Sequence, residues 1–297
     1  MNSTKSFSKA QLWGVELNLI SLLFSSISPV LNKFSLTSLS PVIGGIFTSL
    51  FAAGFVLITI IFRHQTISWH SFANPWLWLL GGTNAIGIIL QYVALSLLSP
   101  ITVTLIERMY LVYVFVLSYI FLREKIEGLD YLAIVLCIIG SFLISGGCLQ
   151  LSDNGWGIIC AFIYPLMYAA NNITAKHLVA DAHPNSVLFY NHSTSAILLL
   201  IFALASGTSF KGFSSSAVAF NFGGAFFNGF LSLLLFYTSL KFISAGKANI
   251  VRAIGPVIVI IYSAFFFPVQ VTPSLILGAI LVLTASVIVT FTKTLHR

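Results

Sequence analysis

The fold is decided by residues 92–144, YVALSLLSPITVTLIERMYLVYVFVLSYIFLREKIEGLDYLAIVLCIIGSFLI, because this segment recurs later in the chain. Displaced by 145 residues without a gap, it meets identical residues at Tyr237 and Val257, among others. A displacement of 143 residues aligns the earlier part of the chain, where Trp13-Gly14 falls on Trp156-Gly157. The chain therefore contains one module written twice, with two residues gained or lost between its parts.

The composition is that of a polytopic membrane protein. Of the 297 residues 58% are hydrophobic and only 7% are charged, and the mean hydropathy is +1.01. A soluble domain of this length needs far more charge on its surface. A helix that crosses about 30 Å of hydrocarbon needs about 20 largely apolar residues. Ten segments meet this requirement: 12–32, 41–62, 76–98, 101–122, 129–147, 155–177, 184–206, 216–240, 248–267 and 274–292.

The repeat divides these ten spans into two sets of five. The expected parts are a tail at 1–11, a first five-helix repeat at 12–148, a second at 155–292 and a tail at 293–297. Because an odd number of crossings makes the second copy enter from the other side, the predicted fold is all-α, with ten transmembrane helices in two inverted repeats. Inverted repeats that meet around a site near the membrane midplane are a recurring architecture of secondary transporters.

Lysine and arginine are sorted to one side of the predicted membrane. The positive-inside rule makes that side cytoplasmic, so both termini are expected there, in a bacterial inner (plasma) membrane. The other side carries only Lys33 and Lys211, while Arg108 and Arg252 lie within spans. The basic residues on the cytoplasmic side are Lys5, Lys9, Arg63, Arg123, Lys125, Lys176, Lys241, Lys247, Lys293 and Arg297.

Several function classes fit the sequence poorly. The net charge of +7 reflects the sorting above, and no clustered basic face suggests nucleic acid. The three cysteines are odd in number and lack ligand spacing, which favours structural thiols. The seven acidic residues are scattered, and there is no HExxH, GxSxG or phosphate-loop pattern. We therefore expect no metal, no cofactor and no enzyme activity.

Polar stripes within spans point to a shared cavity, because polar side chains in a bilayer are costly unless they face protein or water. Span one carries serines at helical spacing on one face. The 143-residue displacement places this stripe on a polar stripe in span six, so that Ser21, Ser25 and Ser28 correspond to Tyr164, Tyr168 and Asn171. The span-six residues are predicted to bind substrate. Close helix packing is the alternative explanation for the serines.

Amides in spans three and eight extend this prediction. Asn84 and Gln91 are seven residues apart and share a helical face, and span eight offers Asn228 in a comparable set. An amide donates and accepts hydrogen bonds at once, which suits zwitterions, sugars and heterocycles equally well.

Spans four and nine carry the charges that we expect on the pathway. Glu107 lies about 9 Å below the outer surface at about 1.5 Å per residue and shares a face with Tyr110. The 145-residue displacement places Glu107 on Arg252, which shares a face with Asn249. An uncompensated charge there costs several kcal/mol. We expect Glu107 to bind a cationic group or the coupling proton and Arg252 an anionic group. A structural salt bridge to another partner is the alternative.

His192 is a second candidate for proton coupling. It lies about two turns from the cytoplasmic end of span seven. Histidine exchanges protons near neutral pH, although a lone histidine within a bundle also serves as a hydrogen-bonded packing residue.

The chain resembles the drug/metabolite transporter superfamily, specifically the ten-span EamA-type transporters with two copies of a five-helix domain. The resemblance covers essentially the whole chain, and its most specific element closes each repeat. In the first copy this element reads Leu122-Arg123-Glu124 followed by Gly140, Leu143-Ile144 and Gly146. The second copy keeps Gly278 but has Pro268-Val269 in place of the glutamate.

The resemblance implies secondary transport of a small organic metabolite such as an amino acid, nucleoside, sugar phosphate or vitamin, driven by protons or by solute exchange. The predicted partners are therefore a small-molecule substrate and the lipid bilayer, with the protein a monomer or a homodimer. A flippase for lipids or lipid-linked substrates is the main alternative, and an intramembrane enzyme is a weaker one.

Overall fold

The computed structural model describes residues 9–65, 72–97, 106–107, 109–123, 128–144, 155–252, 254–255, 258, 261–262 and 272–292. Within these ranges the regular structure is helical, without strands. The helices are α1 (Lys9–Ser35), α2 (Pro41–Phe62), α3 (Pro75–Leu97), α5 (Met109–Phe121), α6 (Gly128–Ile144), α7 (Gly155–Asp181), α8 (Pro184–Ala205), α9 (Ser215–Gly224), the π-helix η2 (Ala225–Ser232), α10 (Leu233–Ser239), α11 (Ala245–Arg252) and α13 (Pro273–Thr292).

The predicted all-α membrane fold is confirmed. Six of the described helices or continuous helical runs are long and apolar enough to cross a membrane, and shorter apolar helices lie at Met109–Phe121, Tyr131–Gly140 and Ile276–Ala285. Each of the ten expected spans overlaps a described helix, although only 248–252 of the expected span 248–267 lie in one, α11. Four helices begin at a proline, where the missing N–H costs no hydrogen bond and the ring fixes a helical φ. The tails at 1–8 and 293–297 lie outside the described residues.

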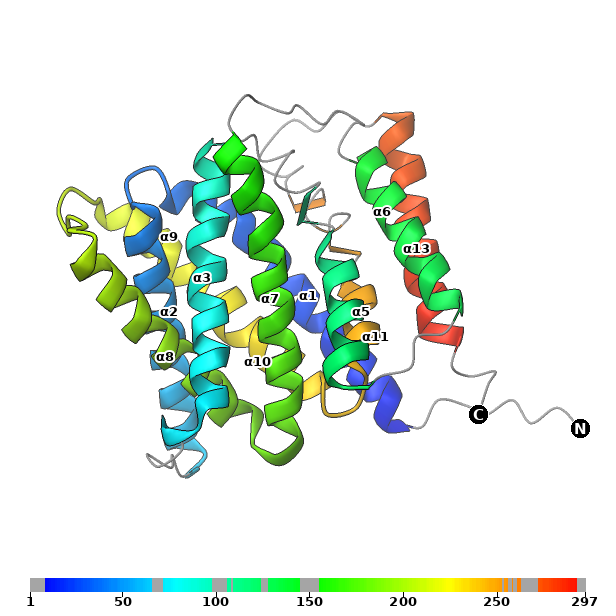
Figure 1. Cartoon of the computed structure of the whole chain (residues 1–297), viewed down its shortest axis with the longest axis horizontal. Helices are drawn as coiled ribbons and strands as arrows, with labels where there is room; N and C mark the ends of the chain where they lie inside the picture. The colour runs from blue at the N-terminus through cyan, green and yellow to red at the C-terminus, as the bar shows by residue number, and fades with distance from the viewer. Residues whose placement is uncertain are drawn as a thin grey trace, which may run out of the picture.

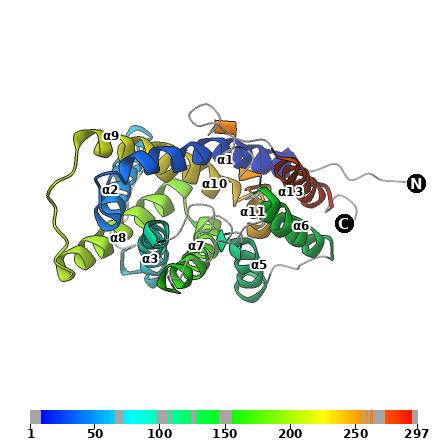
Figure 2. The ribbon, with the colours of Figure 1, turned by 90° about the horizontal axis from the view of Figure 1, so that it is seen from above.

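The helices pair as two inverted repeats should. In Figure 1 α1 rises from the lower edge of the molecule, whereas α7, its counterpart in the second repeat, runs downward. The pairing of α3 with α7 is repeated by the pairing of α9, η2 and α10 with α1. The remaining counterparts contact each other directly: α2 with α8, α5 with α11 and α6 with α13. Seen from above, α6 and α13 lie together at one end of the bundle (Figure 2).

One hydrogen bond occurs in both repeats and confirms the register of the two displacements. The hydroxyl of Tyr92 on α3 bonds to Thr48 on α2. In the second repeat the amide of Asn191 on α8 donates to the hydroxyl of Tyr237 on α10, at 2.9 Å. Thr48 corresponds to Asn191 by 143 residues and Tyr92 to Tyr237 by 145. The repeat found in the sequence is therefore a repeat of contacts as well.

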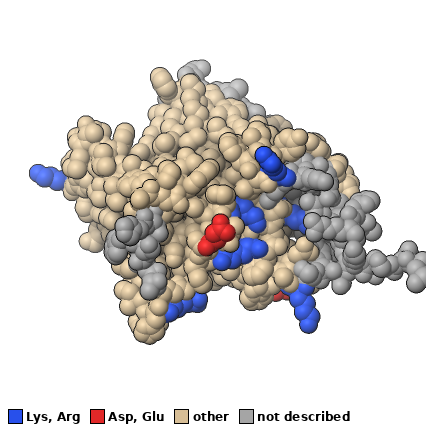
Figure 3. All heavy atoms as spheres, turned by 60° about the horizontal axis from the view of Figure 1, so that its bottom comes forward, with Lys and Arg blue, Asp and Glu red and all other residues tan. Residues whose placement is uncertain are grey.

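Basic residues gather at one end of the bundle. Lys9 begins α1, Arg63 caps α2, Lys241 follows α10 and Lys247 lies in the first turn of α11. Alternating helix directions bring all four positions to the lower edge of Figure 1, and Figure 3 shows several basic side chains around an acidic one on that face. The cytoplasmic assignment of this face stays a prediction.

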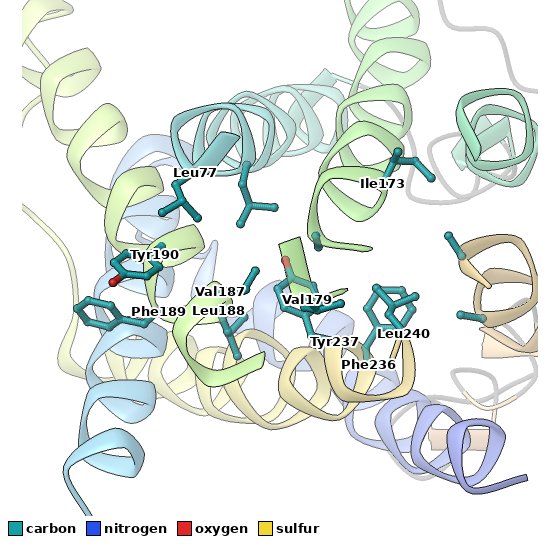
Figure 4. Close-up of a cluster of buried hydrophobic side chains, with 14 of the residues drawn as sticks. Leu77, Ile173, Val179, Val187, Leu188, Phe189, Tyr190, Phe236, Tyr237 and Leu240 are labelled. Atoms are coloured by element: carbon teal, nitrogen blue, oxygen red, sulfur yellow. The ribbon is translucent and has the colours of Figure 1, made fainter. Parts of the chain in front are cut away.

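The main apolar core lies where α3, α7, α8 and α10 meet. Figure 4 shows it with Leu77, Leu188, Phe236 and Leu240 pointing toward one another. This core fixes the relative positions of the helices that carry the polar residues described next.

Candidate functional site

Arg252 ends α11 inside the bundle, and its guanidinium is held by α1 and α10. Its Nη1 donates to the Ser21 hydroxyl at 2.7 Å and its Nη2 donates to Ser25 at 3.2 Å. The guanidinium carbon lies 4.7 Å from the centre of the Phe236 ring, a cation–π contact. Among the residues that the structure describes, these partners include no carboxylate. We call Arg252, Ser21, Ser25 and Phe236 the Arg252 cluster.

Ser21 is itself fixed by bonds across the repeat interface, whereas the Ser25 hydroxyl donates within α1 to the Leu22 carbonyl. The hydroxyl of Ser21 lies 2.8 Å from the Ser232 carbonyl and 3.0 Å from the Ser232 hydroxyl. One turn earlier on α1, the Asn18 amide donates to the Ala248 carbonyl at 2.6 Å. The orientation of the guanidinium therefore depends on the alignment of α1 with the second repeat.

Glu107 lies among tyrosines rather than serines. It is half-buried and close enough to Tyr110 and Tyr168 to interact with both electrostatically. Tyr168 donates to the Gln91 side chain at 2.8 Å, and the Tyr164 ring packs edge-on against it with ring centres 5.9 Å apart. We call Glu107, Gln91, Tyr164 and Tyr168 the Glu107 cluster.

Gly87 lets the Tyr168 ring lie against α3. A Cβ at this position would approach the ring carbons to 2.6 Å, too close for any side chain. The absence of a side chain at residue 87 is therefore part of the geometry of the Glu107 cluster.

The two clusters occupy equivalent positions in the two repeats. Displacement by 145 residues relates Glu107 to Arg252 and Gln91 to Phe236, and displacement by 143 relates Tyr164 and Tyr168 to Ser21 and Ser25. Each cluster also joins both repeats, since Arg252 of the second contacts α1 of the first, and Glu107 of the first faces α7 of the second. Equivalent positions in the two repeats thus carry an acidic residue, Glu107, and a basic residue, Arg252.

Tyr110 connects the clusters. It interacts electrostatically with both Arg252 and Glu107, and its hydroxyl accepts a hydrogen bond from the Asn172 amide. A hydroxyl that faces a cation and an anion can orient a ligand that reaches both.

Beside this region, three buried side chains form a closed hydrogen-bonded ring. Asn171 donates to the side-chain oxygen (Oδ1) of Asn191 at 3.2 Å, Asn191 donates to the Tyr237 hydroxyl at 2.9 Å, and Tyr237 donates back to the side-chain oxygen of Asn171 at 3.2 Å. Asn171 also donates to the Leu80 carbonyl of α3 at 2.6 Å. In this conformation the amide of Asn171 is therefore engaged by the protein, and the ring fastens α7, α8 and α10 to α3.

Replacing Tyr237 with phenylalanine should destabilise the protein by about 1 kcal/mol, because it leaves Asn171 and Asn191 each short of one partner in a buried site. Thermal unfolding of the purified protein in detergent measures the change. Tyr119→Phe is the matched control, since Tyr119 is 62% exposed on α5 and loses no buried bond. Equal melting temperatures for the two variants would contradict the hydrogen-bonded ring of Asn171, Asn191 and Tyr237.

Comparison with known proteins identifies the family. A model of the EamA-like transporter family matches residues 12–146 and 155–291. The chain belongs to the EamA-like transporter family. It is also 27% identical over 158 residues to an uncharacterized transporter, YxxF, of Bacillus subtilis (strain 168). That match covers 52% of this chain and only 50% of the relative's length. A solved crystal structure shares the fold, with a TM-score of 0.79 over 98% of this chain and 100% of the other, at 12% identity.

Among the remaining predicted residues of this EamA-like transporter, Asn84 and His192 have hydrogen-bond partners outside the two clusters. Asn84 is buried and donates to the Ser195 hydroxyl at 3.3 Å. Asn228 is half-buried within η2, and the side chain of Asn249 lies outside the described residues. His192 is 2% exposed and bonds to the Gly229 carbonyl of η2 at 2.7 Å. No described group of three or more His, Cys, Asp or Glu residues could hold a metal ion.

Sequence reasoning missed three residues of the site in this EamA-like transporter. Phe236 is apolar, so no polar stripe contains it, although its alignment with Gln91 marks the position. Tyr237 served only as a marker of the repeat, and Asn172 lies off the stripe of Tyr164, Tyr168 and Asn171. The predicted roles of the other residues in substrate binding stay predictions.

Proposed function

We propose that the protein is a secondary transporter for a small zwitterionic metabolite, in which Arg252 binds the anionic group and Glu107 the cationic group. The observation that carries the proposal is the Arg252 cluster. An arginine inside a membrane protein is costly unless it is compensated, and the described partners of Arg252 are two hydroxyls and an aromatic ring. A carboxylate or phosphate group of a substrate would supply the missing charge.

The surroundings of Glu107 support the other half of the proposal. Tyrosine hydroxyls and rings accompany the carboxylate in this cluster, and aromatic faces attract cations. Tyr110, which interacts with both charged residues, would then lie beside the middle of the ligand. Asn84 and Asn228 would act as orienting groups only in another conformation, in which they approach the clusters.

Alternating access fits the placement of the charges. Because each cluster includes side chains of both repeats, rocking of one repeat against the other would change both clusters together. Substrate binding at the repeat interface would thereby couple to the movement. For the driving force we favour protonation of Glu107 in exchange for the cationic group, since one carboxylate cannot hold both at once.

A ligand-induced thermal-shift experiment on the purified protein tests this function. The panel contains amino acids, nucleosides and sugar phosphates, with the methyl ester and the N-acetyl derivative of each amino acid that stabilises the protein. We expect stabilisation by the zwitterion, and weaker stabilisation by either derivative, because each lacks one charge. In Glu107→Gln the free and N-acetylated amino acids should become equivalent. Stabilisation by phospholipids alone would instead favour the flippase.

A further inference from the structure

The helix that corresponds to α3 in the second repeat contains a π-helical segment, η2, which α3 lacks. Within η2 the N–H of Leu233 donates to the carbonyls of Asn228 and Phe230. In an α-helix this N–H would donate to Gly229, four residues earlier. The carbonyl of Gly229 is thus deprived of its α-helical donor, and the Nε2–H of His192 on α8 donates to it instead, at 2.7 Å.

From this geometry we infer that His192 is a positioning residue, which keeps η2 in its π-helical form and so fixes the rotation of the Ser232 and Phe236 side chains toward the Arg252 cluster. A π-helical turn inserts about one extra residue relative to an α-helix. Its loss would rotate the following helix by about 100° and shift it by about 1.5 Å. Ser232 would then leave Ser21, and Phe236 would leave the guanidinium of Arg252.

The neighbours of Gly229 show that this arrangement is built into the packing. A Cβ on Gly229 would lie 3.0 Å from the Cβ of Ala52 and 3.8 Å from the His192 ring. An alanine at this position would require Ala52 on α2 to move by a few tenths of an ångström, whereas its distance to His192 on α8 would be an ordinary contact. The counterpart of His192 in the first repeat is Ser49, opposite an α3 that has no π-helical segment. The imidazole and the π-helix therefore occur together.

The spacing between equivalent residues along the chain also differs between the two repeats. Asn191 and Tyr237 are 46 residues apart, two more than their counterparts Thr48 and Tyr92, although both pairs make the same contact. The loop between α8 and α9, residues 206–214, is shorter than the loop between α2 and α3 in the first repeat, residues 63–74. The helical segment up to the tyrosine is therefore five residues longer in the second repeat, 215–237 against 75–92, and a π-helical turn accounts for about one of these residues.

The hydrogen bonding of His192 favours this role over proton transfer. With Nε2–H donating to a carbonyl, the neutral ring carries a lone pair on Nδ1, which has no hydrogen-bond partner in the described part of the chain. Protonation would add an N–H at Nδ1 that finds no described acceptor in a site 2% exposed to solvent. A neutral imidazole can hold the turn without that cost.

Disulfide cross-linking tests the rotation of η2 and α10 relative to α1, and it needs no substrate. Ser232, the last residue of η2, has its hydroxyl 3.0 Å from that of Ser21, and Ser214, which precedes both α9 and η2, has its hydroxyl 3.0 Å from that of Ser38. Cysteine pairs at 21/232 and 38/214 are made in a protein whose Cys137, Cys148 and Cys160 are alanine. With His192 present, both pairs should oxidise. With His192→Asn, whose amide is too short to reach Gly229, the 21/232 yield should fall at least fivefold while the 38/214 yield is unchanged.

His192→Gln distinguishes the positioning of η2 from proton transfer. Its amide nitrogen matches Nε2 in reach but does not titrate. We expect it to retain the 21/232 cross-link and the pH profile of uptake. Retained cross-linking in His192→Asn would overturn the inference, as would a His192→Gln protein that cross-links normally but loses pH-driven uptake. The consequence for transport rests on the proposed function of Arg252, whereas the cross-link does not. The cross-link therefore tests the positioning role of His192 separately from the proposed transport function.

Discussion

Replacing Arg252 with methionine is expected to lower the affinity for a substrate that carries an anionic group by about 30-fold or more. Removing one partner of a buried, charge-assisted contact costs about 2–5 kcal/mol, and each 1.4 kcal/mol is a factor of ten. Uptake of the identified substrate into proteoliposomes, measured over a range of concentrations, gives the change. The methyl ester of an amino acid substrate, which lacks the anion, should bind wild type and variant equally.

The same substitution should leave the substrate-free protein as stable as before, or stabilise it. Methionine removes a buried charge and fills much of the same volume against Phe236, and such replacements are often neutral or stabilising. Loss of affinity together with an unchanged or higher melting temperature is the signature of a ligand-binding charge. A structural ion pair would instead give a large loss of stability.

Two controls complete the Arg252 experiment. Arg252→Lys keeps the charge but cannot bond to Ser21 and Ser25 through a planar guanidinium, so an intermediate affinity is expected. Arg63→Met removes a charge from the C-terminal cap of α2, outside both clusters, and should not alter uptake. If Arg252→Met transports as well as Arg63→Met does, the anionic half of the proposed site is wrong.

The sequence was sufficient for the fold because the fold depends on features that are local or repeated. Hydropathy defines the spans, and the two displacements define which spans correspond. The bonds of Tyr92 with Thr48 and of Tyr237 with Asn191 show that the correspondence extends to single contacts. The serine stripe of α1 includes Ser21 and Ser25, which both accept hydrogen bonds from Arg252, and its role in substrate binding stays a prediction.

The interior of the site could not be read from the sequence for two physical reasons. The bonding partner of a buried amide depends on the rotation of neighbouring helices, so a stripe that holds Tyr164, Tyr168 and Asn171 does not reveal that Asn171 turns to Asn191 and Tyr237. A π-helical segment leaves no periodic signal in an apolar run such as that of η2. The side chains after it are therefore rotated relative to an α-helical expectation.

Among the glycines that the structure describes, Gly81 is the one whose replacement with alanine is expected to destabilise the protein most. Gly81 lies where α3 crosses α8, and a Cβ there would overlap the Thr194 hydroxyl and lie 2.6 Å from the Thr194 Cβ. It would also lie 2.8 Å from the backbone nitrogen of Ser195. These are not the flexible ends of side chains, so the helices themselves must separate. Overpacking of this kind costs about 3 kcal/mol or more.

Gly82 provides a matched control one residue away. The nearest atom to a Cβ on Gly82 is the Leu198 Cδ1 at 3.7 Å, an ordinary contact. Because alanine forms helix more readily than glycine by about 1 kcal/mol, Gly82→Ala should be neutral or stabilising, opposite in sign to Gly81→Ala. The yield of monodisperse protein and its melting temperature in detergent measure both.

A second substitution shows whether the crossing itself is the cause. Thr194→Gly in the Gly81→Ala background removes two of the three close neighbours and leaves the Ser195 nitrogen, so a partial recovery of yield is expected. Thr194 also donates to the Tyr190 carbonyl at 2.6 Å, within α8. It also donates to the Leu77 carbonyl of α3 at 3.3 Å, so Thr194→Gly alone should be destabilising, and the recovery is judged against that single variant. If Gly81→Ala is as stable as Gly82→Ala, α3 and α8 do not approach as closely as the structure has them, and the alignment of Asn84 with Ser195 would be wrong as well.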